Sequence, residues 1–313
     1  MTPKERAIAA FNLTEPDDVV PTFELQFQLA DELLGKCHIG DKELDEAPPN
    51  ERERMLKANA ELYIEEAERL DYSMVVAMLG PGGQYFVDTV KHIRKLVGDR
   101  YLIAVPNDCT MGIPNGSNMM QLVEDLVERP DEVHANLRGH LQNALAHGRV
   151  VADAGADCCL MCADYCFNAG PFLSPKMFRE WVTPYLTEFV AGMREMGYYT
   201  VKHTDGDIMP ILDQLVEARP HALHSIDPQA GVDLKTVKQM VGDKIALCGN
   251  VHCGMLHNGT IEQVVEDSKR ALRDGMPGGG FFFCTSNTPF KGMPLENYLA
   301  MLEVRKEYGR YDR

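Results

Sequence analysis

A histidine and two aspartates follow one apolar stretch of the chain at alternating positions. His203, Asp205 and Asp207 come directly after the β-branched and aromatic run 199–201, which is typical of a buried strand. Alternate residues of an extended chain point the same way, so we expect the side chains of His203 and Asp205 on one face. Imidazole and carboxylate groups bind divalent metal ions such as zinc and also transfer protons. A metal site at this point needs at least one more ligand from elsewhere in the chain.

Strand-like segments alternate with helix-like segments along the chain and are joined by short connections. The predicted strands cover residues 19–27, 73–79, 101–105, 157–162, 199–201 with His203 at its carboxyl end, 222–226, 244–247 and 280–284. Such alternation predicts parallel βαβ units, which over 313 residues favour an α/β fold, a closed (β/α)8 barrel of the TIM type. We expect one domain over residues 1–313, with N-terminal helical additions. A doubly wound open sheet is the alternative, but no glycine-rich dinucleotide fingerprint follows the first predicted strand.

Helices are expected between these strands. The predicted helices cover residues 2–11, 51–70, 87–97, 119–128, 131–147, 174–196, 208–218, 234–241, 261–274 and 294–308. The clearest helix start is Ser174-Pro175, with serine at the cap and proline at the first helical position.

Polar residues gather at the ends of the predicted strands, where the mouth of a barrel lies and where the active sites of this fold are found. The set comprises Glu24, Gln26, Asn107, Asp108, Asp164, His203, Asp205, Asp227, Asn250, His252 and Cys284. A capped helix or a hydrogen-bonded turn explains any one of them equally well, but the cluster as a whole favours an active site. Glu24 stands out because a carboxylate within an apolar strand is costly to bury unless it is paired or bound to a metal.

The net charge of the chain limits the kinds of binding partner that we expect. The formal net charge is −16, which argues against nucleic acid, anionic lipid or a polyanionic substrate. No stretch is apolar enough to cross a membrane, and the N-terminus has the charged residues of a helix start, so we expect a cytoplasmic protein without a membrane partner.

The nine cysteines of a cytoplasmic protein should be reduced thiols that serve as core residues, ligands or nucleophiles. Four of them crowd into 158–166 without a partner pair at zinc-ribbon spacing, and the seventeen methionines would suit an anaerobic cell.

Several short motifs in the second half of the chain occur in a characteristic order and spacing. They are Asp164, Ser174-Pro175, Pro184-Tyr185, His203-Thr204-Asp205-Gly206-Asp207, Gly249-Asn250-Val251, Gly279-Gly280-Phe281, Thr288-Pro289 and Pro294-Leu295-Glu296-Asn297. In these motifs the chain resembles the uroporphyrinogen decarboxylase superfamily, closely over the second half and loosely over the first. The resemblance implies a distorted (β/α)8 barrel. It also implies one of two kinds of enzyme: the haem-pathway decarboxylase, or a zinc-dependent methyltransferase that works with a corrinoid protein.

The decarboxylase of this superfamily carries an arginine cluster after its first strand, for a substrate with many carboxylates. This chain has no arginine between Arg6 and Arg52 and lacks the Arg-Gln-Ala-Gly-Arg type of motif. Its negative charge also opposes the binding of a polyanion. The decarboxylase is therefore the less favoured of the two.

The resemblance to the methyltransferases implies a zinc site. In those enzymes a His-x-Cys pair and a distant cysteine bind zinc, and here His203 matches the histidine and Cys284 matches the distant cysteine. Asp205 replaces the middle cysteine, so the third ligand is either Asp205 or Glu24 reaching across the mouth. The alternative role for Cys284 is a small apolar filler. Carboxylate and imidazole ligands leave zinc a harder Lewis acid than thiolates do, which suits an oxygen or nitrogen substrate.

We therefore predict a methyltransferase that takes a methyl group from a small methylated donor, with zinc on the ether oxygen, and passes it to the cobalt of a corrinoid carried by a partner protein. A methoxylated aromatic is the leading donor because aromatic residues fall near predicted strand ends, and methylamines or methylated thiols are alternatives.

In this hypothesis the catalytic residues are His203, Asp205 and Asp164, and the substrate-binding residues are Glu24, Asn107, Asp108, Tyr165, Asn250 and His252. A homodimer is compatible with it. The hypothesis of another class is a non-catalytic barrel that binds metal or corrinoid, against which the presence of both His203 and Cys284 argues.

Overall fold

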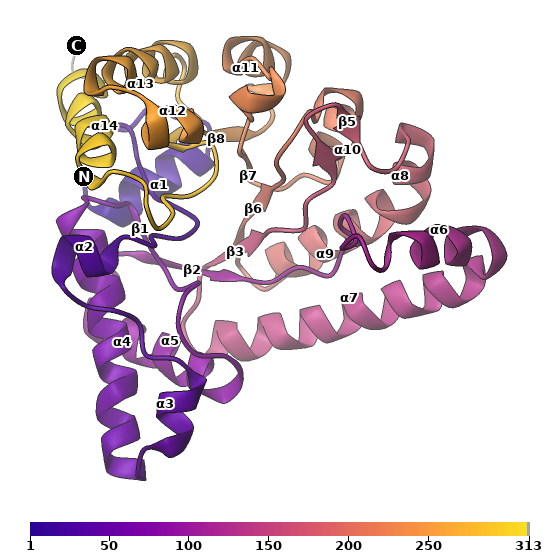
Figure 1. The fold of residues 1–313 in the computed structure, drawn as a ribbon, viewed down its shortest axis with the longest axis horizontal. Coiled ribbons are helices and arrows are strands. Elements are labelled where there is room, and N and C mark those ends of the chain that lie inside the picture. The colour runs from indigo at the N-terminus through magenta and orange to yellow at the C-terminus, as the bar shows by residue number, and fades with distance from the viewer. Residues whose placement is uncertain (312–313) are drawn as a thin grey trace.

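The computed structural model describes residues 1–311 and contains a curled sheet of seven parallel strands (Figure 1). Its order is β1 (Met74–Val76), β2 (Leu102–Pro106), β3 (Cys158–Met161), β6 (Tyr199–His203), β7 (Ala222–His224), β8 (Ala246–Val251) and β9 (Phe281–Thr285). Strands that follow one another in this order along the chain are parallel neighbours, as in consecutive βαβ units. A separate antiparallel pair, β4 (Cys166–Phe167) and β5 (Gly170–Pro171), lies beyond β3. The prediction of a TIM-type barrel is confirmed.

An irregular segment takes the place of the eighth strand. The carbonyl of Pro21 accepts a hydrogen bond of 2.9 Å from the N–H of Phe283 in β9, and the carbonyl of Thr22 accepts one of 2.7 Å from Ser73, just before β1. The segment therefore joins the two edge strands, but the prediction of a regular strand over 19–27 is wrong. Proline has no N–H to donate to a ladder, and the segment makes too few regular bonds to form a strand.

Helices surround the sheet. Their bounds are α1 (Pro3–Phe11), α2 (Ala30–Leu34), α3 (Asp41–Glu46), α4 (Pro49–Arg69), α5 (Gly83–Val97), α6 (Met119–Glu128), α7 (Pro130–Asp153), α8 (Pro175–Trp181), α9 (Thr183–Glu195), α10 (Leu212–Glu217), α11 (Leu234–Val241), α12 (Cys253–Asn258), α13 (Ile261–Gly275) and α14 (Leu295–Tyr308), with two short 3₁₀ turns. The predicted helix 174–196 is two helices, because Pro184 near the start of α9 lacks the N–H that a continuous helix needs. The long helix α7 extends away from the sheet and carries α6 at its far end (Figure 1).

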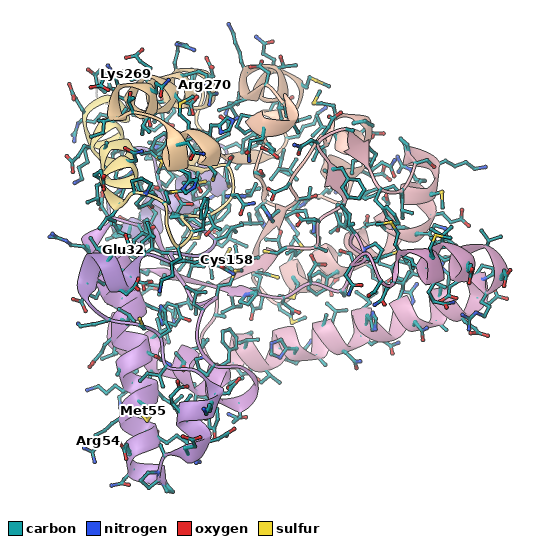
Figure 2. The ribbon with its side chains drawn as sticks, in the orientation of Figure 1. Glu32, Arg54, Met55, Cys158, Lys269 and Arg270 are labelled. Atoms are coloured by element: carbon teal, nitrogen blue, oxygen red, sulfur yellow. The ribbon has the colours of Figure 1, made fainter. Side chains whose placement is uncertain are left out.

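The strands separate two apolar regions, as alternation of side chains requires. Residues that face the barrel interior include Leu102, Cys158, Val201, Ala246 and Phe282, whereas their strand neighbours pack against the outer helices. Figure 2 places Cys158 near the centre of the molecule. Phe11 of α1 stacks on Tyr199 at 4.8 Å and lies 4.7 Å from Phe282, between ring centroids. Helix α1 thus fills the amino-terminal end of the barrel, and the carboxyl ends of the strands are left for a site.

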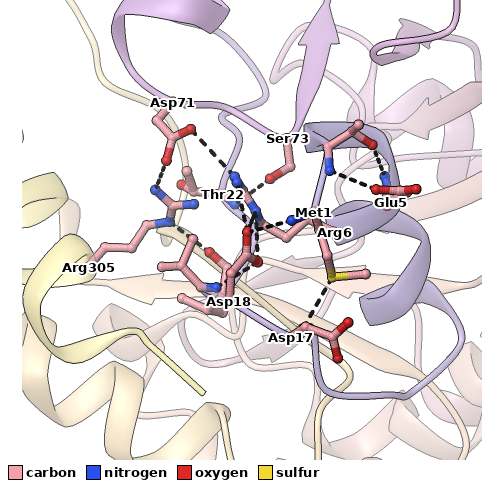
Figure 3. Close-up of polar contacts among 12 residues, drawn as sticks. Met1, Glu5, Arg6, Asp17, Asp18, Thr22, Asp71, Ser73 and Arg305 are labelled. Carbon is pink, nitrogen blue, oxygen red and sulfur yellow. Dashed lines mark hydrogen bonds and ion pairs between the residues drawn. The ribbon is translucent and has the colours of Figure 1, made fainter. Parts of the chain in front are cut away.

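An ionic network with two buried arginines and two partly exposed aspartates holds the irregular segment in place (Figure 3). Arg305 of α14, fully buried, donates to the carbonyl of Val20 and to Asp71, both at 2.8 Å. Arg6 of α1 bonds Asp18 at 3.2 Å and Asp71 at 3.4 Å. Because buried charges need partners, this network ties α1, α14 and the segment that joins β9 to β1 into one arrangement.

No helix among the described residues is both long and apolar enough to cross a membrane.

Candidate metal centre

Three of the predicted site residues meet at the carboxyl ends of β3 and β6. The Nε2 atom of His203 lies 3.6 Å from Oδ1 of Asp164 and 3.8 Å from Oδ1 of Asp205. One ligand atom from each residue lies within 4.8 Å of the other two, and within residues 1–311 this is the one group of three or more His, Cys, Asp or Glu side chains that is so arranged. The expectation that His203 and Asp205 share a face agrees with this geometry.

The backbone around the group explains how it forms. His203 ends β6, and Asp164 follows the neighbouring strand β3. The N–H of Asp205 donates to Oδ1 of Asp164 at 3.0 Å. The next residue, Gly206, has φ +85°, and a Cβ there would lie 2.6 Å from the carbonyl oxygens of Cys166 and Phe167. Only glycine fits this close approach without strain, so Gly206 sets the path of the loop that presents Asp205.

The carboxylate of Asp205 is held at both oxygens. Ser225 Oγ donates to Oδ1 at 2.9 Å, and the side-chain amide of Asn287 donates to Oδ2. Burial raises the pKa of Asp205 to about 7, and the negative charges of Asp164 and Asp227 add to the rise. A divalent cation would relieve this repulsion, since an opposite charge within a few ångströms favours the ionised carboxylate. The donor set, one imidazole and two carboxylates, therefore fits a divalent metal ion such as zinc.

His203 is oriented by a second histidine. Its Nδ1 atom lies 2.9 Å from Nδ1 of His224, the register partner on β7. Burial lowers the pKa of His203 to about 3, with a smaller contribution from the positive charge of Lys202. The ring is therefore neutral at physiological pH, as a metal ligand must be.

Glu24 and Cys284 lie outside the three-residue group. Glu24 is buried against α14, where it accepts bonds from Thr285 N–H at 3.1 Å, Thr285 Oγ1 at 2.6 Å and Tyr298 OH at 3.3 Å. Burial raises its pKa to about 8. Cys284 is fully buried in the interior cluster with Cys248 and Phe282. Neither side chain belongs to the group formed by Asp164, His203 and Asp205, which differs in this respect from the predicted ligand set.

Asp108, Asn107 and Tyr165 hold two loops together. Asp108 accepts from Lys202 Nζ and from Ala163 N–H, both at 3.0 Å. Burial opposes ionisation, but the Lys202 charge and the hydrogen bonds keep the pKa of Asp108 below its ordinary value. Asn107 donates to the carbonyl of Ala144 at 2.9 Å, while Tyr165 OH bonds Thr110 at 2.6 Å beneath the Lys202 ammonium. The polar groups of these three residues therefore already have hydrogen-bond partners within the protein.

Four other predicted residues also make internal bonds. Asn250 donates to the carbonyl of Ile226 at 2.8 Å and accepts from Arg270 at 3.0 Å. His252 caps α12 by accepting from Met255 N–H at 3.3 Å. Asp227 accepts from Gly206 N–H at 3.1 Å and caps the following turn. Gln26 accepts from the Gln28 side chain at 2.9 Å.

Three residues at the site were not anticipated from sequence: Ser225, His224 and Asn287. Ser225 and His224 belong to the predicted strand 222–226, and the strand alternation that singled out His203 would also have placed His224 on an inner face. Asn287 follows β9 in an irregular loop, where no spacing indicates which way a side chain points.

A parallel barrel with a histidine and two carboxylates at the carboxyl ends of its strands has the architecture of the (β/α)8-barrel enzymes, whose sites lie at this face. The family model for uroporphyrinogen decarboxylase (URO-D) matches residues 62–308. The chain belongs to this family.

Relatives with different activities match the chain. A uroporphyrinogen decarboxylase from Aromatoleum aromaticum is 23% identical over 241 residues, covering 72% of this chain and 64% of the relative. The methylcobamide:CoM methyltransferase MtbA from Methanosarcina acetivorans is 27% identical over 174 residues, covering 52% and 46%. The chain thus spans less than two-thirds of the length of these curated relatives.

A solved structure supports the fold over almost all of the chain. The methyltransferase from Methanosarcina mazei superposes with a TM-score of 0.77 at 18% identity and covers 98% of this chain and 99% of its own. At this identity the match confirms the barrel fold.

Proposed function

We propose that this chain is a zinc-dependent methyltransferase. It transfers a methyl group from a small methylated donor, with a methoxylated aromatic as the leading candidate, to the cobalt of a corrinoid protein. The observation that carries the proposal is the group formed by His203, Asp205 and Asp164 at the carboxyl ends of the strands. The match to a methyltransferase whose name specifies a methylcobamide substrate supports it.

The proposed metal ligands are Nε2 of His203 and one carboxylate oxygen from each of Asp205 and Asp164. Three protein ligands are typical of catalytic zinc sites, which keep a further position for water or substrate. When bound, zinc supplies a Lewis acid for the donor's oxygen. This set of one nitrogen and two oxygens contains no thiolate, which favours an oxygen donor over a thiol.

The surrounding residues fix the approach to the site. The His203 side chain is 7% exposed, whereas the Asp164 side chain is 45% exposed. A donor therefore reaches the group from the side of Asp164. Ser225 and Asn287 hold Asp205 in one orientation through its two oxygens, so the ligand set needs little rearrangement on binding.

The alternative is a decarboxylase like the Aromatoleum relative. The carboxylates of Asp164, Asp205 and Asp227 gather at this mouth, and such a field repels a substrate that carries many carboxylates. The absence of arginine between Arg6 and Arg52 agrees with this argument. A methylcorrinoid:thiol coenzyme methyltransferase remains the alternative within the methyltransferases, and a non-catalytic metal- or corrinoid-binding barrel is the alternative of another class.

Metal content tests the ligand set. The chain is purified without chelators and analysed for metals, together with His203→Ala, Asp205→Ala and Cys284→Ala. We expect one zinc per chain in the wild type and in Cys284→Ala, and none in the other two variants. Loss of zinc in Cys284→Ala would show instead that Cys284 is a zinc ligand, as the sequence predicts. A metal-free wild type would overturn the zinc mechanism.

Activity tests the reaction. Free cob(I)alamin serves as the methyl acceptor, methoxybenzoates serve as donors, and methylation is followed through the change in cobalamin absorbance. We expect methylation by the wild type and none by His203→Ala. Decarboxylation of uroporphyrinogen without any methylation would overturn the proposal in favour of the decarboxylase.

A further inference from the structure

His203 and His224 form a buried pair inside the barrel. They are register partners on the parallel strands β6 and β7, and their Nδ1 atoms lie 2.9 Å apart. His224 is 1% exposed, and its Nε2 atom is buried without a hydrogen-bond partner. Its neighbours include the ring of Phe23, at 6.1 Å between centroids. Among the described residues, the His224 side chain thus hydrogen-bonds to His203 alone.

Two neutral imidazoles can share this bond in two ways. In one arrangement His224 donates from Nδ1, and His203 carries its own proton on Nε2, which faces Asp164 and Asp205 at 3.6 and 3.8 Å. In the other, His203 donates from Nδ1, its Nε2 lone pair is free, and His224 carries its proton on Nε2. Each arrangement places one proton on each ring, so the net charge of the pair is unchanged between them.

The two carboxylates decide between these arrangements. Without a cation, a proton on Nε2 of His203 is attracted to the carboxylates and a lone pair is repelled. With a divalent ion, Nε2 must offer its lone pair, so the ring proton has to lie on Nδ1. His224 is the group placed to accept a hydrogen bond from that Nδ1–H.

We propose that His224 is a positioning residue for the metal centre, and that the hydrogen bond between the two Nδ1 atoms reverses its direction when metal binds. This inference rests on the proposed function, because it requires a metal ion at His203. Metal-binding histidines usually donate their second N–H to a carboxylate, a carbonyl or water. Here a neutral imidazole takes that place and can serve as donor in one state and acceptor in the other.

Zinc affinity tests the positioning role, measured by competition with a chromogenic chelator. His224→Asn keeps a carbonyl oxygen where it can accept from Nδ1 of His203, and His224→Leu removes the acceptor at similar volume. We expect His224→Leu to bind zinc about 10- to 100-fold more weakly, and His224→Asn to recover most of the loss. His140→Leu, at an exposed histidine of α7, is the control. Wild-type affinity in His224→Leu, or equal losses in both His224 variants, would overturn the positioning role.

Nitrogen NMR of ¹⁵N-histidine-labelled protein tests the reversal, with His224→Asn and His203→Ala used to assign the two rings. Long-range ¹H–¹⁵N correlations distinguish Nδ1–H from Nε2–H imidazole. In metal-free protein we expect Nε2–H for His203 and Nδ1–H for His224, and the opposite assignment for both after zinc is added. The same His224 tautomer in both states would overturn the reversal while leaving the proposed function standing. A wild type that binds no zinc in the competition assay would instead overturn the proposed function.

Discussion

The backbone N–H of Asp205 donates a hydrogen bond to Oδ1 of Asp164 at 3.0 Å. This bond joins the loops that follow the neighbouring strands β3 and β6 and brings two carboxylates to the same nitrogen of His203. Each carboxylate raises the free energy of the other in the ionised state. A cation between them lowers that free energy, and for this reason we propose that the group binds a metal ion.

Asp164→Asn separates the charge of this residue from its hydrogen bond. The amide oxygen can still accept from Asp205, but one negative charge is lost. We expect zinc affinity to fall by at least about 100-fold, because two unit charges about 4 Å apart interact by about 4 kcal/mol at an effective dielectric of about 20. Chelator competition measures the change.

Asp207→Asn is the matched control. Asp207 lies two residues from Asp205 but caps the next turn through Met209 N–H at 3.0 Å. Its charge lies outside the ligand group, so we expect a change within about threefold because solvent and salt screen such charges. Equal losses in the two variants would show that the site responds to net charge rather than to Asp164 as a ligand.

Lys202→Met tests the buried ion pair that joins the loops after β2 and β3. Lys202 is fully buried and bonds Asp108 at 3.0 Å and the carbonyl of Ala163 at 2.8 Å. Removing one partner leaves Asp108 buried without a counter-charge, so we expect a loss of about 3–5 kcal/mol in the free energy of unfolding. Urea denaturation measures it, with the exposed Lys176→Met as control. Adding Asp108→Asn should restore part of the loss, and no recovery would contradict the ion-pair explanation.

The fold was predictable where side chains alternate or recur regularly. The apolar runs around Val201, Leu223 and Phe282 identified strands because each is buried on both faces, and the helices between them follow from their amphipathic spacing. The irregular segment at Pro21 was not predictable from sequence. Its place between β9 and β1 depends on tertiary contacts of Arg305 with Val20 and Asp71. A hydrophobic run alone does not distinguish it from a strand.

The site was predictable only in part. The two-residue spacing of His203 and Asp205 predicts that their side chains lie close together, although β6 ends at His203 and Asp205 lies in the loop that follows. For Glu24, the direction of the side chain depends on the path of an irregular segment, which the spacing does not indicate. Phe23 packs in the barrel interior, so Glu24 points the other way, toward Tyr298. Asn287 reaches Asp205 across 82 positions of sequence, a contact that no local spacing indicates.

Glu24→Gln tests the buried carboxyl against α14 through the pH dependence of stability. Burial raises its pKa from 4.5 to about 8 in the folded chain. Between these values the folded state binds more protons than the unfolded state, so stability falls as pH rises, by up to about 1.4 kcal/mol per pH unit. The stabilisation that comes from the raised pKa of Glu24 is fully present below pH 4.5 and is lost as pH rises through 8.

Urea unfolding of the wild type and Glu24→Gln from about pH 6 to pH 8 measures this effect. The glutamine stays neutral, so the wild type should lose stability relative to the variant as pH rises. For Glu180→Gln, at an exposed position of α8, the free energy of unfolding should change with pH as it does in the wild type. A difference between wild type and Glu24→Gln that does not change with pH would contradict a protonated Glu24.

Gly206→Ala tests the loop that presents Asp205, and Gly231→Ala provides the comparison. Both glycines have positive φ, +85° and +76°, so alanine adds backbone strain of about 1–2 kcal/mol at each. At Gly231 a Cβ meets nothing within 4 Å, whereas at Gly206 it meets two carbonyl oxygens at 2.6 Å. The loop at Gly206 must therefore move, and Asp205 must move with it. We expect both variants to lose some thermal stability but only Gly206→Ala to lose zinc. Zinc retained at the wild-type level in Gly206→Ala would mean that Asp205 is not a ligand, or that the loop binds metal in more than one conformation.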